Sequence, residues 1–251
     1  MTSKSSPILG IDTGGTFTDF VYLHQPGAKH QVQVHKVLST PHAPDEAILQ
    51  GIEEMALTES VRSGAILIIH GTTVATNAAL EGKGVRTAYI TNSGLADVLA
   101  IGRQTREELY NLTPDLPKVR FDPSLNLEVD VRLDAKGEVV TPLTPAALKQ
   151  LERDVKSLKP EAIAINLLFS YLDPADEMTI EALFQEHFFV SRSSFVLPEI
   201  NEYERGISTW VNSWIGPLIR DYLNSLQRSL APAPLAIMQS SGHTVASHLA
   251  A

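Results

Sequence analysis

Residues 10–20 read GIDTGGTFTDF, and this segment decides how the N-terminal part of the chain folds. A short apolar run at residues 7–11 leads into it and a second strand-like run follows at residues 18–23. The glycines Gly14 and Gly15 between two such runs predict a β-hairpin. Glycine lets a backbone approach a ligand closely and turn its N–H groups toward it. The hairpin is therefore a candidate phosphate-binding turn.

Polar side chains around the two glycines extend this candidate site. Asp12 and Asp19 repel phosphate, but they can hold Mg²⁺, usually through water. Neither the Walker sequence G-x-x-x-x-G-K-[ST] nor the dinucleotide sequence G-x-G-x-x-G occurs in the segment. An ordinary glycine turn with polar neighbours is the alternative interpretation. The candidate phosphate-binding residues are Thr13, Gly14, Gly15, Thr16 and Thr18.

Strands and helices alternate along the rest of the chain, which predicts an α/β fold with a mixed sheet and flanking helices. Residues 103–142 interrupt this alternation as an irregular excursion. The longest helix opens near Glu202, and Gly216-Pro217 should kink or divide it. The expected strands are 32–37, 65–69, 85–91, 162–168, 194–197 and 235–238, and the expected helices are 45–56, 72–82, 145–158 and 174–188.

The composition excludes several classes of function. The 251 residues carry a net charge of -9, which disfavours non-specific nucleic-acid binding because such binding needs clustered Lys and Arg. The absence of cysteine excludes disulfides, thiolate metal sites and a cysteine nucleophile. No apolar stretch approaches the ~18 residues needed to cross a bilayer. We therefore expect a soluble, cytoplasmic protein.

The sequence HGTTVATN at residues 70–77 is a second candidate site. It follows a buried strand at the point where a helix begins, and such a place offers free N–H groups to an anion. His70 adds a side chain that titrates near neutral pH. Thr72, Thr73 and Asn77 are candidates for binding a substrate carbonyl or a phosphate. The alternative is structural, with the threonines capping the helix and His70 bonding a backbone carbonyl.

Four charged residues further along the chain are weaker candidates. Arg103 is suited to bidentate contact with a carboxylate or a phosphate, although loop arginines are more often solvated. Arg106 is a less favoured candidate for the same role. Glu202 and Arg205 open the long helix, where an acidic first turn and a local salt bridge are the simplest interpretation.

The hairpin resembles the first phosphate motif of the actin, Hsp70 and sugar-kinase superfamily, which binds ATP phosphates with a β-hairpin after its first strand. Several further motifs make the chain similar to the N-terminal region of the hydantoinase A/5-oxoprolinase family. They are HGTTVATN at 70–77, the turn at Gly94, IGRQ at 101–104, LLFSYLDP at 167–174, EYER at 202–205 and MQSSG at 238–242. The resemblance implies an actin-like (ribonuclease H-like) ATPase lobe with the second lobe largely missing, and hence a piece of a longer protein.

The resemblance also implies an organisation and a set of ligands. Residues 1–190 would be the family's N-terminal region, and residues 191–251 the truncated start of the hydantoinase A region. ATP and Mg²⁺ are the implied cofactors, with Asp12 and Asp19 at the metal. The residues implied to contact the substrate or the transferred phosphoryl group are His70, Thr72, Thr73, Asn77 and Arg103.

The activity implied by the resemblance is ATP-dependent ring opening of a cyclic amide such as 5-oxoproline or a hydantoin. The amide oxygen would take the γ-phosphate of ATP and so open the carbonyl carbon to water, a reaction that depends mainly on positioning and charge neutralisation. The isolated piece is expected to be inactive, and a hydantoinase B-type subunit or domain is the expected partner. The alternatives are an acetone- or acetophenone-type ATP-dependent carboxylase, a sugar or acyl kinase, and a non-catalytic binding module.

Overall fold

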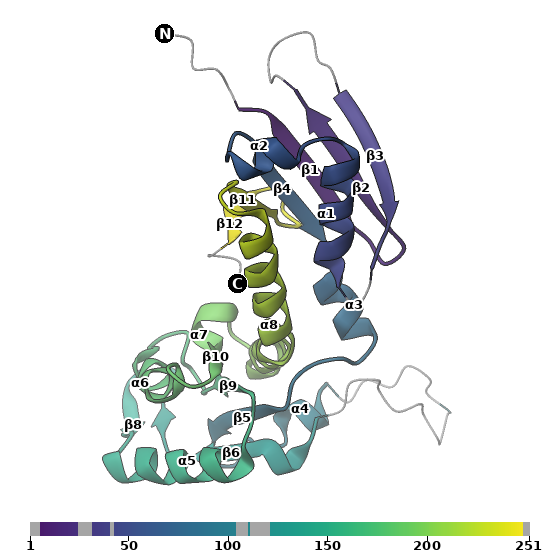
Figure 1. The fold of residues 1–251 in the computed structure, drawn as a ribbon. Helices are drawn as coiled ribbons and strands as arrows, with labels where there is room; N and C mark the ends of the chain where they lie inside the picture. Colours follow the sequence, from purple (N-terminus) through teal and green to yellow (C-terminus); the bar gives the residue numbers. More distant parts are fainter. Residues whose placement is uncertain (1–5, 25–31, 41–42, 104–109, 111–120, 248–251) are drawn as a thin grey trace, which may run out of the picture. The chain divides into compact units, whose positions relative to one another are not determined.

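The computed structural model describes residues 6–24, 32–40, 43–103, 110 and 121–247, and the chain divides into two compact units (Figure 1). Unit 1 consists of Met1–Ala78 and Leu218–Ala251, and unit 2 of Ala79–Pro217. Unit 2 is thus inserted in the sequence of unit 1. The division expected near residue 190 concerns family regions, and it stays a prediction.

Unit 1 is built on a six-stranded mixed sheet, as the sequence predicts. The order is β12-β11-β4-β1-β2-β3, in which β11, β4 and β1 run parallel and the other neighbours antiparallel. Its strands are β1 Ile8–Thr13, β2 Phe17–Leu23, β3 Val32–Leu38, β4 Leu67–Thr72, β11 Leu235–Met238 and β12 Thr244–Ala246. Its helices are α1 Pro44–Glu54, α2 Thr58–Arg62, the start of α3 Val74–Leu80 and the C-terminal part of α8 Glu202–Leu230.

One face of this sheet, termed here the covered face, packs against helices. Strand side chains such as Leu9, Phe20 and Ile68 join a single hydrophobic core with residues of α1 and α8, for example Ile48 and Leu226. Figure 1 shows α1 lying along this sheet. Burying large aliphatic and aromatic side chains stabilises a fold by about 1.5–3 kcal/mol each. This core therefore fixes which side of every strand is available for a ligand.

The opposite face, termed here the open face, is exposed to solvent over much of its described area. Val21, Val34 and Met238 lie there with 47%, 68% and 49% of their surface exposed. Because successive side chains of a strand alternate between faces, each residue of the phosphate hairpin belongs to one face or the other.

Unit 2 is a four-stranded parallel sheet in the order β10-β9-β5-β6 with helices on both faces. One face packs against α5 and α6, and the other against α4 and the N-terminal part of α8. Its main strands are β5 Thr87–Asn92, β6 Asn126–Val129, β9 Ala162–Asn166 and β10 Phe189–Arg192, with a small pair β7 Arg132–Leu133 and β8 Val139–Thr141. Its helices are α4 Val98–Ile101, the short η1 Pro123–Leu125, α5 Pro145–Leu158, α6 Ala175–Phe184 and α7 Ser193–Val196.

The strand expected at residues 194–197 is wrong, because Ser193–Val196 forms helix α7 and the strand lies just before it. A long-range contact explains the difference. Glu177 of α6 accepts hydrogen bonds from Ser193 Oγ at 2.7 Å and from the Ser194 backbone N–H at 2.8 Å. This carboxylate satisfies one of the free N–H groups at the start of α7, which no local sequence pattern indicates.

The long helix α8 continues through Pro217 and is not divided there. A proline inside a helix costs about 3 kcal/mol through the lost hydrogen bond and steric clash. Large buried side chains on each side of it, such as Trp214 before and Leu223 after, offset that cost. In the described part of the chain, no helix has the length and apolarity that a membrane crossing requires.

Candidate functional site

The two acidic residues of the hairpin lie side by side on the open face. Asp12 of β1 and Asp19 of β2 are Cα partners in the antiparallel pair, and Thr13 is paired with Thr18 one position nearer the turn. The turn itself is closed by a hydrogen bond of 3.0 Å from the Gly14 N–H to the Phe17 carbonyl. The predicted β-hairpin is therefore present, with its carboxylates on one side of the sheet.

The loop after β3 supports the hairpin from behind. Ser39 Oγ donates to the Gly14 carbonyl at 2.8 Å and lies 3.0 Å from Thr18 Oγ1. The Ser39 N–H also donates to the Thr16 carbonyl at 2.9 Å. Three contacts from one serine hold the turn on both of its arms. Sequence reasoning missed Ser39, because nothing local marks it as a neighbour of residues 14–18.

The hydroxyls of the hairpin threonines do not share one environment. Thr13 and Thr18 are buried, with 3% and 0% of their surface exposed, and their side chains point into the covered face. Thr16 and Gly15 are exposed at the turn. A phosphate on the open side can therefore reach the backbone N–H groups of the turn and the Thr16 hydroxyl, but not the hydroxyls of Thr13 and Thr18.

A pocket lies on the open face beside the acidic pair. Gly71 of β4 is the Cα partner of Asp12, and a Cβ atom at Gly71 would lie 3.4 Å from Asp12 Oδ1. The absence of a side chain at this position therefore leaves room next to the carboxylate. The pocket is lined by Gly10, Ile11, Asp12, Asp19, Val21, Ile69, Gly71 and Met238.

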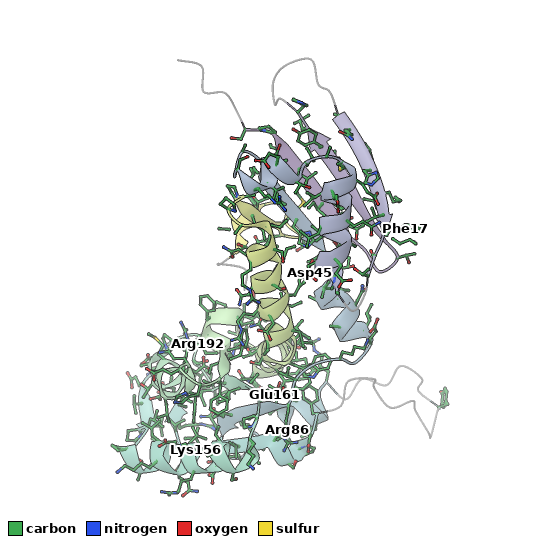
Figure 2. The ribbon with its side chains drawn as sticks, viewed as in Figure 1. Phe17, Asp45, Arg86, Lys156, Glu161 and Arg192 are labelled. Atoms are coloured by element: carbon green, nitrogen blue, oxygen red, sulfur yellow. The ribbon has the colours of Figure 1, made fainter. Side chains whose placement is uncertain are left out.

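Lys36 of β3 forms an ion pair with Asp19, with Nζ and Oδ1 2.9 Å apart. The two residues are Cα partners in the β2–β3 pair, so their side chains leave the sheet on the same face. Lys36 Nζ also lies 4.9 Å from the ring centroid of Phe17, which Figure 2 labels at the start of β2. Sequence reasoning missed Lys36, although counting the period-two alternation across both strands would have placed it opposite Asp19.

The start of α3 lies against the hairpin. The Thr73 N–H and its hydroxyl both donate to the Thr13 carbonyl at 3.3 Å, and Asn77 Nδ2 donates to Thr73 Oγ1 at 3.3 Å. A Cβ atom on Gly15 would lie 3.7 Å from Asn77 Nδ2. The structure thus brings Thr73 and Asn77 to the hairpin. Thr72 Oγ1 accepts from the N–H of Val74, the first residue of α3, at 3.2 Å, so it holds the connection between β4 and α3.

His70 is fully buried, with 0% of its surface exposed, and its Nε2 lies 2.7 Å from the hydroxyl of Tyr222 on α8. Burial lowers the pKa of His70 to about 4, with a smaller opposite effect from the Ile11 carbonyl, so the imidazole is neutral at pH 7. Burial raises the pKa of Tyr222 to about 12, while the Thr72 and Thr13 hydroxyls act in the opposite direction. Sequence reasoning missed Tyr222 as a partner of His70, because the two residues are 152 positions apart.

The structure does not bring His70 to the acidic pair. Ile11 is its Cα partner in the β1–β4 pair, whereas the partner of Asp12 is Gly71. His70 therefore projects into the covered face, and Asp12 and Asp19 project from the open face. This placement matches the structural alternative for His70 more closely than direct contact with a substrate.

Arg103 belongs to unit 2, where it is exposed and forms an ion pair with Glu204 of α8. This pair holds the pKa of the Glu204 carboxyl below its usual range. Because Arg103 is largely exposed, solvent and salt screen this pair. Arg106 lies outside the described residues.

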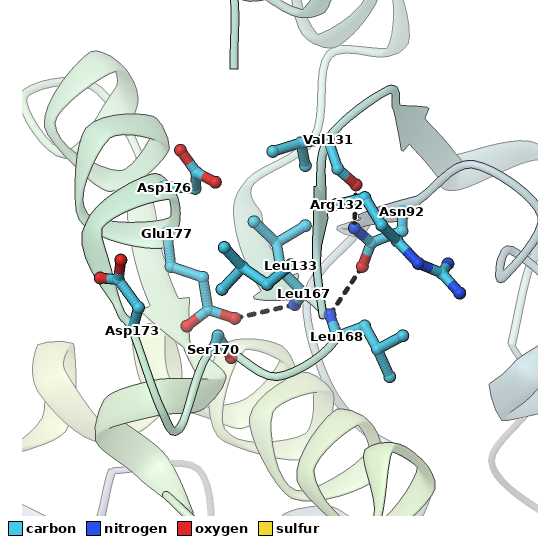
Figure 3. Close-up of a pocket in the computed structure, with 10 residues that line it drawn as sticks. All are labelled: Asn92, Val131, Arg132, Leu133, Leu167, Leu168, Ser170, Asp173, Asp176 and Glu177. Carbon is cyan, nitrogen blue, oxygen red and sulfur yellow. Dashed lines mark hydrogen bonds between the residues drawn. The ribbon is translucent and has the colours of Figure 1, made fainter. Parts of the chain in front are cut away.

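The motif at residues 167–174 has a structural role in unit 2. Glu177 Oε1 accepts from the Leu167 N–H at 2.8 Å, and Asn92 Oδ1 accepts from the Leu168 N–H at 2.6 Å (Figure 3). Asp176 lines one pocket with Leu167 and Glu177, and burial and Asp173 raise the pKa of its carboxyl. The buried carboxylate of Glu177 thus accepts from two backbone N–H groups and from the Ser193 hydroxyl.

Arg205 is a buried anchor rather than a surface ion-pair residue. Only 1% of its surface is exposed, and its Nη2 donates to the Leu167 carbonyl at 2.6 Å and to Asn166 Oδ1 at 3.2 Å. The guanidinium also lies 5.3 Å from the ring centroid of Tyr171. Burial lowers its pKa, although arginine stays protonated. The local salt bridge expected from sequence is therefore replaced by bonds to carbonyl groups.

Comparisons with known proteins agree with this arrangement. Residues 8–188 match the family described as the hydantoinase/oxoprolinase N-terminal region. The caprolactamase subunit alpha of Pseudomonas jessenii is 30% identical over 96% of this chain and 36% of its own length. The 5-oxoprolinase 1 of Arabidopsis thaliana is 32% identical over 92% of this chain and 21% of its own length. This chain therefore spans well under half of the curated relatives that it matches.

Two solved structures share the fold. The ATP-dependent caprolactamase of Pseudomonas jessenii matches with a TM-score of 0.82 and 28% identity, over 96% of this chain and 36% of that one. A nucleotide-free acetone carboxylase matches with a TM-score of 0.80 and 23% identity, over 98% of this chain and 38% of that one. The fold is thus that of an actin-like ATPase lobe with a mixed sheet and flanking helices. The chain belongs to the hydantoinase/oxoprolinase family.

Proposed function

We propose that this chain supplies the phosphate-binding part of an enzyme that opens a cyclic amide with hydrolysis of ATP. The observation that carries the proposal is the Asp12–Asp19 pair, which lies on the open face beside a glycine turn and a pocket. Family membership supports the same reaction class, because the caprolactamase relative is described as ATP-dependent. The residues present also suit the two implied ligands, ATP and Mg²⁺.

The acidic pair fits Mg²⁺ by its chemistry. Magnesium in nucleotide sites is usually bound through one or two carboxylates together with phosphate oxygens and water. Within the described residues no cluster of three or more His, Cys, Asp or Glu could hold a metal by itself. We therefore assign Asp12 and Asp19 to a Mg²⁺ ion that is shared with the nucleotide. Bound there, the ion would neutralise phosphate charge during phosphoryl transfer.

The turn would hold the phosphates mainly through its backbone. Gly14 and Gly15 let N–H groups approach an anion closely, and the exposed Thr16 adds a hydroxyl. Thr13 and Thr18 would act through the backbone and the hairpin framework, because their hydroxyls are buried.

The substrate-side roles follow from distance to this turn. We assign Thr73 and Asn77 to contact with the transferred phosphoryl group or the amide, since both lie against the hairpin. Thr72 would contribute through its position at the start of α3. His70 would act from the covered face of the sheet, and Arg103, a residue of unit 2, is assigned to the substrate by the family resemblance alone.

The chemistry requires positioning more than a covalent nucleophile. The amide oxygen of the ring bonds to the γ-phosphorus of ATP as the bond to ADP breaks. Water then adds to the activated carbon, and the ring C–N bond breaks as the nitrogen takes up a proton, which leaves an acyl phosphate. A second water hydrolyses the acyl phosphate to the carboxylate and free phosphate. The residues of this protein would hold the three phosphates so that the amide oxygen, the γ-phosphorus and the departing ADP oxygen lie in line.

The substrate class, partner and location are part of the same proposal. The relatives act on caprolactam-type and 5-oxoproline-type rings by name, so a lactam or a hydantoin is the proposed substrate. The caprolactamase relative is named as a subunit alpha, which supports a second, hydantoinase B-type subunit. The need for ATP supports a cytoplasmic location.

The direct test is ATP hydrolysis by the full-length parent protein, together with its partner subunit, against a panel of lactams and hydantoins. Stimulation by one cyclic amide, with one ring opened per ATP, would support the proposal and name the substrate. Stimulation that requires bicarbonate and a ketone would assign the protein to the carboxylases instead. A stable phosphorylated product would indicate a kinase, and no stimulation by any compound would leave a binding module.

A further inference from the structure

Two buried polar atoms behind the hairpin have no hydrogen-bond partner within the described residues. They are Thr13 Oγ1 and His70 Nδ1. A buried polar atom without a partner costs about 1–3 kcal/mol, so two of them on one face of a sheet call for an explanation. Both residues lie beside Tyr222 of α8, a residue that has no part in the proposed chemistry.

Tyr222 joins parts of unit 1 that are far apart in sequence. Its hydroxyl lies 2.7 Å from His70 Nε2, although 152 positions separate the two residues. The two rings meet edge to face, with centroids 5.8 Å apart. Thr13 and Thr72 are Cα partners in the β1–β4 pair and project, like His70, into the covered face, and their hydroxyls oppose the rise that burial causes in the pKa of Tyr222. The contacts of one side chain therefore reach the end of β1, the end of β4 and α8.

Because the imidazole is neutral, one of its nitrogens donates and the other accepts, and this decides which groups of the cluster donate hydrogen bonds. The Ile11 carbonyl makes no full hydrogen bond with Nδ1, but it lies next to the ring and can only accept, so it favours a proton on Nδ1. His70 Nε2 is then an acceptor, and the Tyr222 hydroxyl donates to it. The Tyr222 oxygen remains free to accept from a threonine hydroxyl. Thr13 and Thr72 are paired with each other two positions beyond the Ile11–His70 pair, on the same face of the sheet.

We propose that His70 and Tyr222 form a positioning pair for the hairpin, in which the Tyr222 hydroxyl, held by His70 Nε2, fixes Thr13 and Thr72. Thr13 directly precedes the turn at Gly14, and its carbonyl accepts both donors of Thr73. Fixing Thr13 therefore sets the backbone N–H groups of the turn and the start of α3 together.

The effect of this pair on nucleotide binding rests on the proposed function, whereas its effect on the hairpin does not. His70 is fully buried and projects into the covered face, away from the acidic pair. Neither partner is a catalytic residue, because both act on the site through the backbone. Loss of the Tyr222 hydroxyl should loosen the turn while it leaves the hydrophobic core intact.

The first test measures amide hydrogen exchange in the 251-residue chain and in Tyr222→Phe. The matched control is Tyr89→Phe, which removes another buried tyrosine hydroxyl, one that accepts from Asn166 Nδ2 at 2.9 Å in unit 2. Loss of one hydrogen bond worth about 1 kcal/mol corresponds to about fivefold faster exchange. We expect that increase for the amides of residues 13–18 and 72–74 in Tyr222→Phe, and no increase there in Tyr89→Phe.

A double variant examines the pair itself. In His70→Gln/Tyr222→Phe, the exchange of the hairpin amides should be no faster than in the faster single variant, since both changes break one interaction. Additive effects of the two changes, or unchanged hairpin exchange in Tyr222→Phe, would overturn the positioning role.

The second test measures the affinity for Mg²⁺-ATP by calorimetry in the same proteins. We expect about fivefold weaker binding in Tyr222→Phe, matching the exchange result, and unchanged binding in Tyr89→Phe. If the unsubstituted chain binds no Mg²⁺-ATP, the proposed function fails for this chain while hydrogen exchange still decides the positioning role. If Tyr222→Phe binds as tightly as the unsubstituted chain, the link between the pair and the nucleotide is overturned.

Discussion

Asp12 and His70 project from opposite faces of the same sheet, although the strands that carry them are hydrogen-bonded neighbours. The β4 residue paired with Asp12 is Gly71, which has no side chain, and the β1 residue paired with His70 is Ile11. Changes on the open face should therefore alter ligand binding with little effect on stability. Changes on the covered face should alter the free energy of unfolding or the order of the hairpin.

Asp12→Asn should weaken Mg²⁺ dependence without unfolding the protein. The substitution keeps the shape of the side chain and removes the charge that a hard cation prefers. We expect at least a tenfold rise in the Mg²⁺ concentration that gives half-maximal ATP hydrolysis, or about 1.4 kcal/mol. Asp130→Asn, which changes an exposed aspartate of unit 2, is the control. An unchanged Mg²⁺ dependence in Asp12→Asn would remove Asp12 from the metal site.

Lys36→Gln should change the apparent affinity for Mg²⁺ in the opposite direction. Lys36 pairs with Asp19 at 2.9 Å, so it competes with a metal for that carboxylate. We expect the Kd for Mg²⁺ to fall about two- to fivefold at low ionic strength, and the difference to shrink as salt screens the pair. A Mg²⁺ titration at two salt concentrations measures this effect. Weaker Mg²⁺ binding in the variant would show that Lys36 does not compete.

The buried His70 should make stability depend on pH. An unfolded histidine has a pKa near 6.5, and burial lowers the pKa of His70 to about 4. Between these values the unfolded chain binds the proton first, so the free energy of unfolding falls as the pH falls from about 6.5 to about 4. The full contribution is present above pH 6.5 and amounts to about 3 kcal/mol at most.

Urea unfolding over this pH range, in the unsubstituted chain and in His70→Gln, measures the contribution. Gln keeps a donor and an acceptor but does not titrate in this range. The stability of His70→Gln should therefore depend less steeply on pH between about 6.5 and 4. Equal slopes for the two proteins would contradict the assignment of a buried, neutral His70.

Gly51→Ala should destabilise unit 1. A Cβ atom at Gly51 of α1 would lie 2.2 Å from the Phe20 ring, which is fully buried against this helix. Overpacking of this kind costs about 1–3 kcal/mol. Gly10→Ala is the matched control, because its Cβ would lie at an ordinary distance of 3.6 Å from the Val21 carbonyl. Chemical denaturation of both variants measures the difference, and equal stabilities would contradict the close contact.

The sequence predicted correctly the elements that are marked by residues at or near their own ends. The helix expected at residues 145–158 is α5, and its start is marked by Thr144, whose Oγ1 accepts from the Ala147 N–H at 3.2 Å. The strand expected at 235–238 is β11. Both have a capping residue or an apolar run within a few residues of their ends, so tertiary contacts did not need to be known.

The candidate site was predictable only in part. The hairpin and its acidic pair follow from residues 10–20, because the partners in a hairpin are close in sequence. The residues that support this site come from elsewhere in the chain: Lys36 from β3, Ser39 from the loop after β3, and Tyr222 from α8. Alternation shows that Ile68 and His70 share a face, but the choice between the covered and the open face depends on where α8 packs.

The arrangement of unit 1 has a consequence for its biosynthesis. β4 pairs with β1 on one side and with β11 on the other, yet all of unit 2 is translated between β4 and β11. Until Leu235–Met238 leaves the ribosome, one edge of an apolar strand in the nascent chain has no partner. Such an edge is a template for aggregation. We therefore expect unit 1 to complete its fold only after unit 2 has been translated, or with the help of a chaperone, whereas unit 2 is contiguous and free to fold as it emerges.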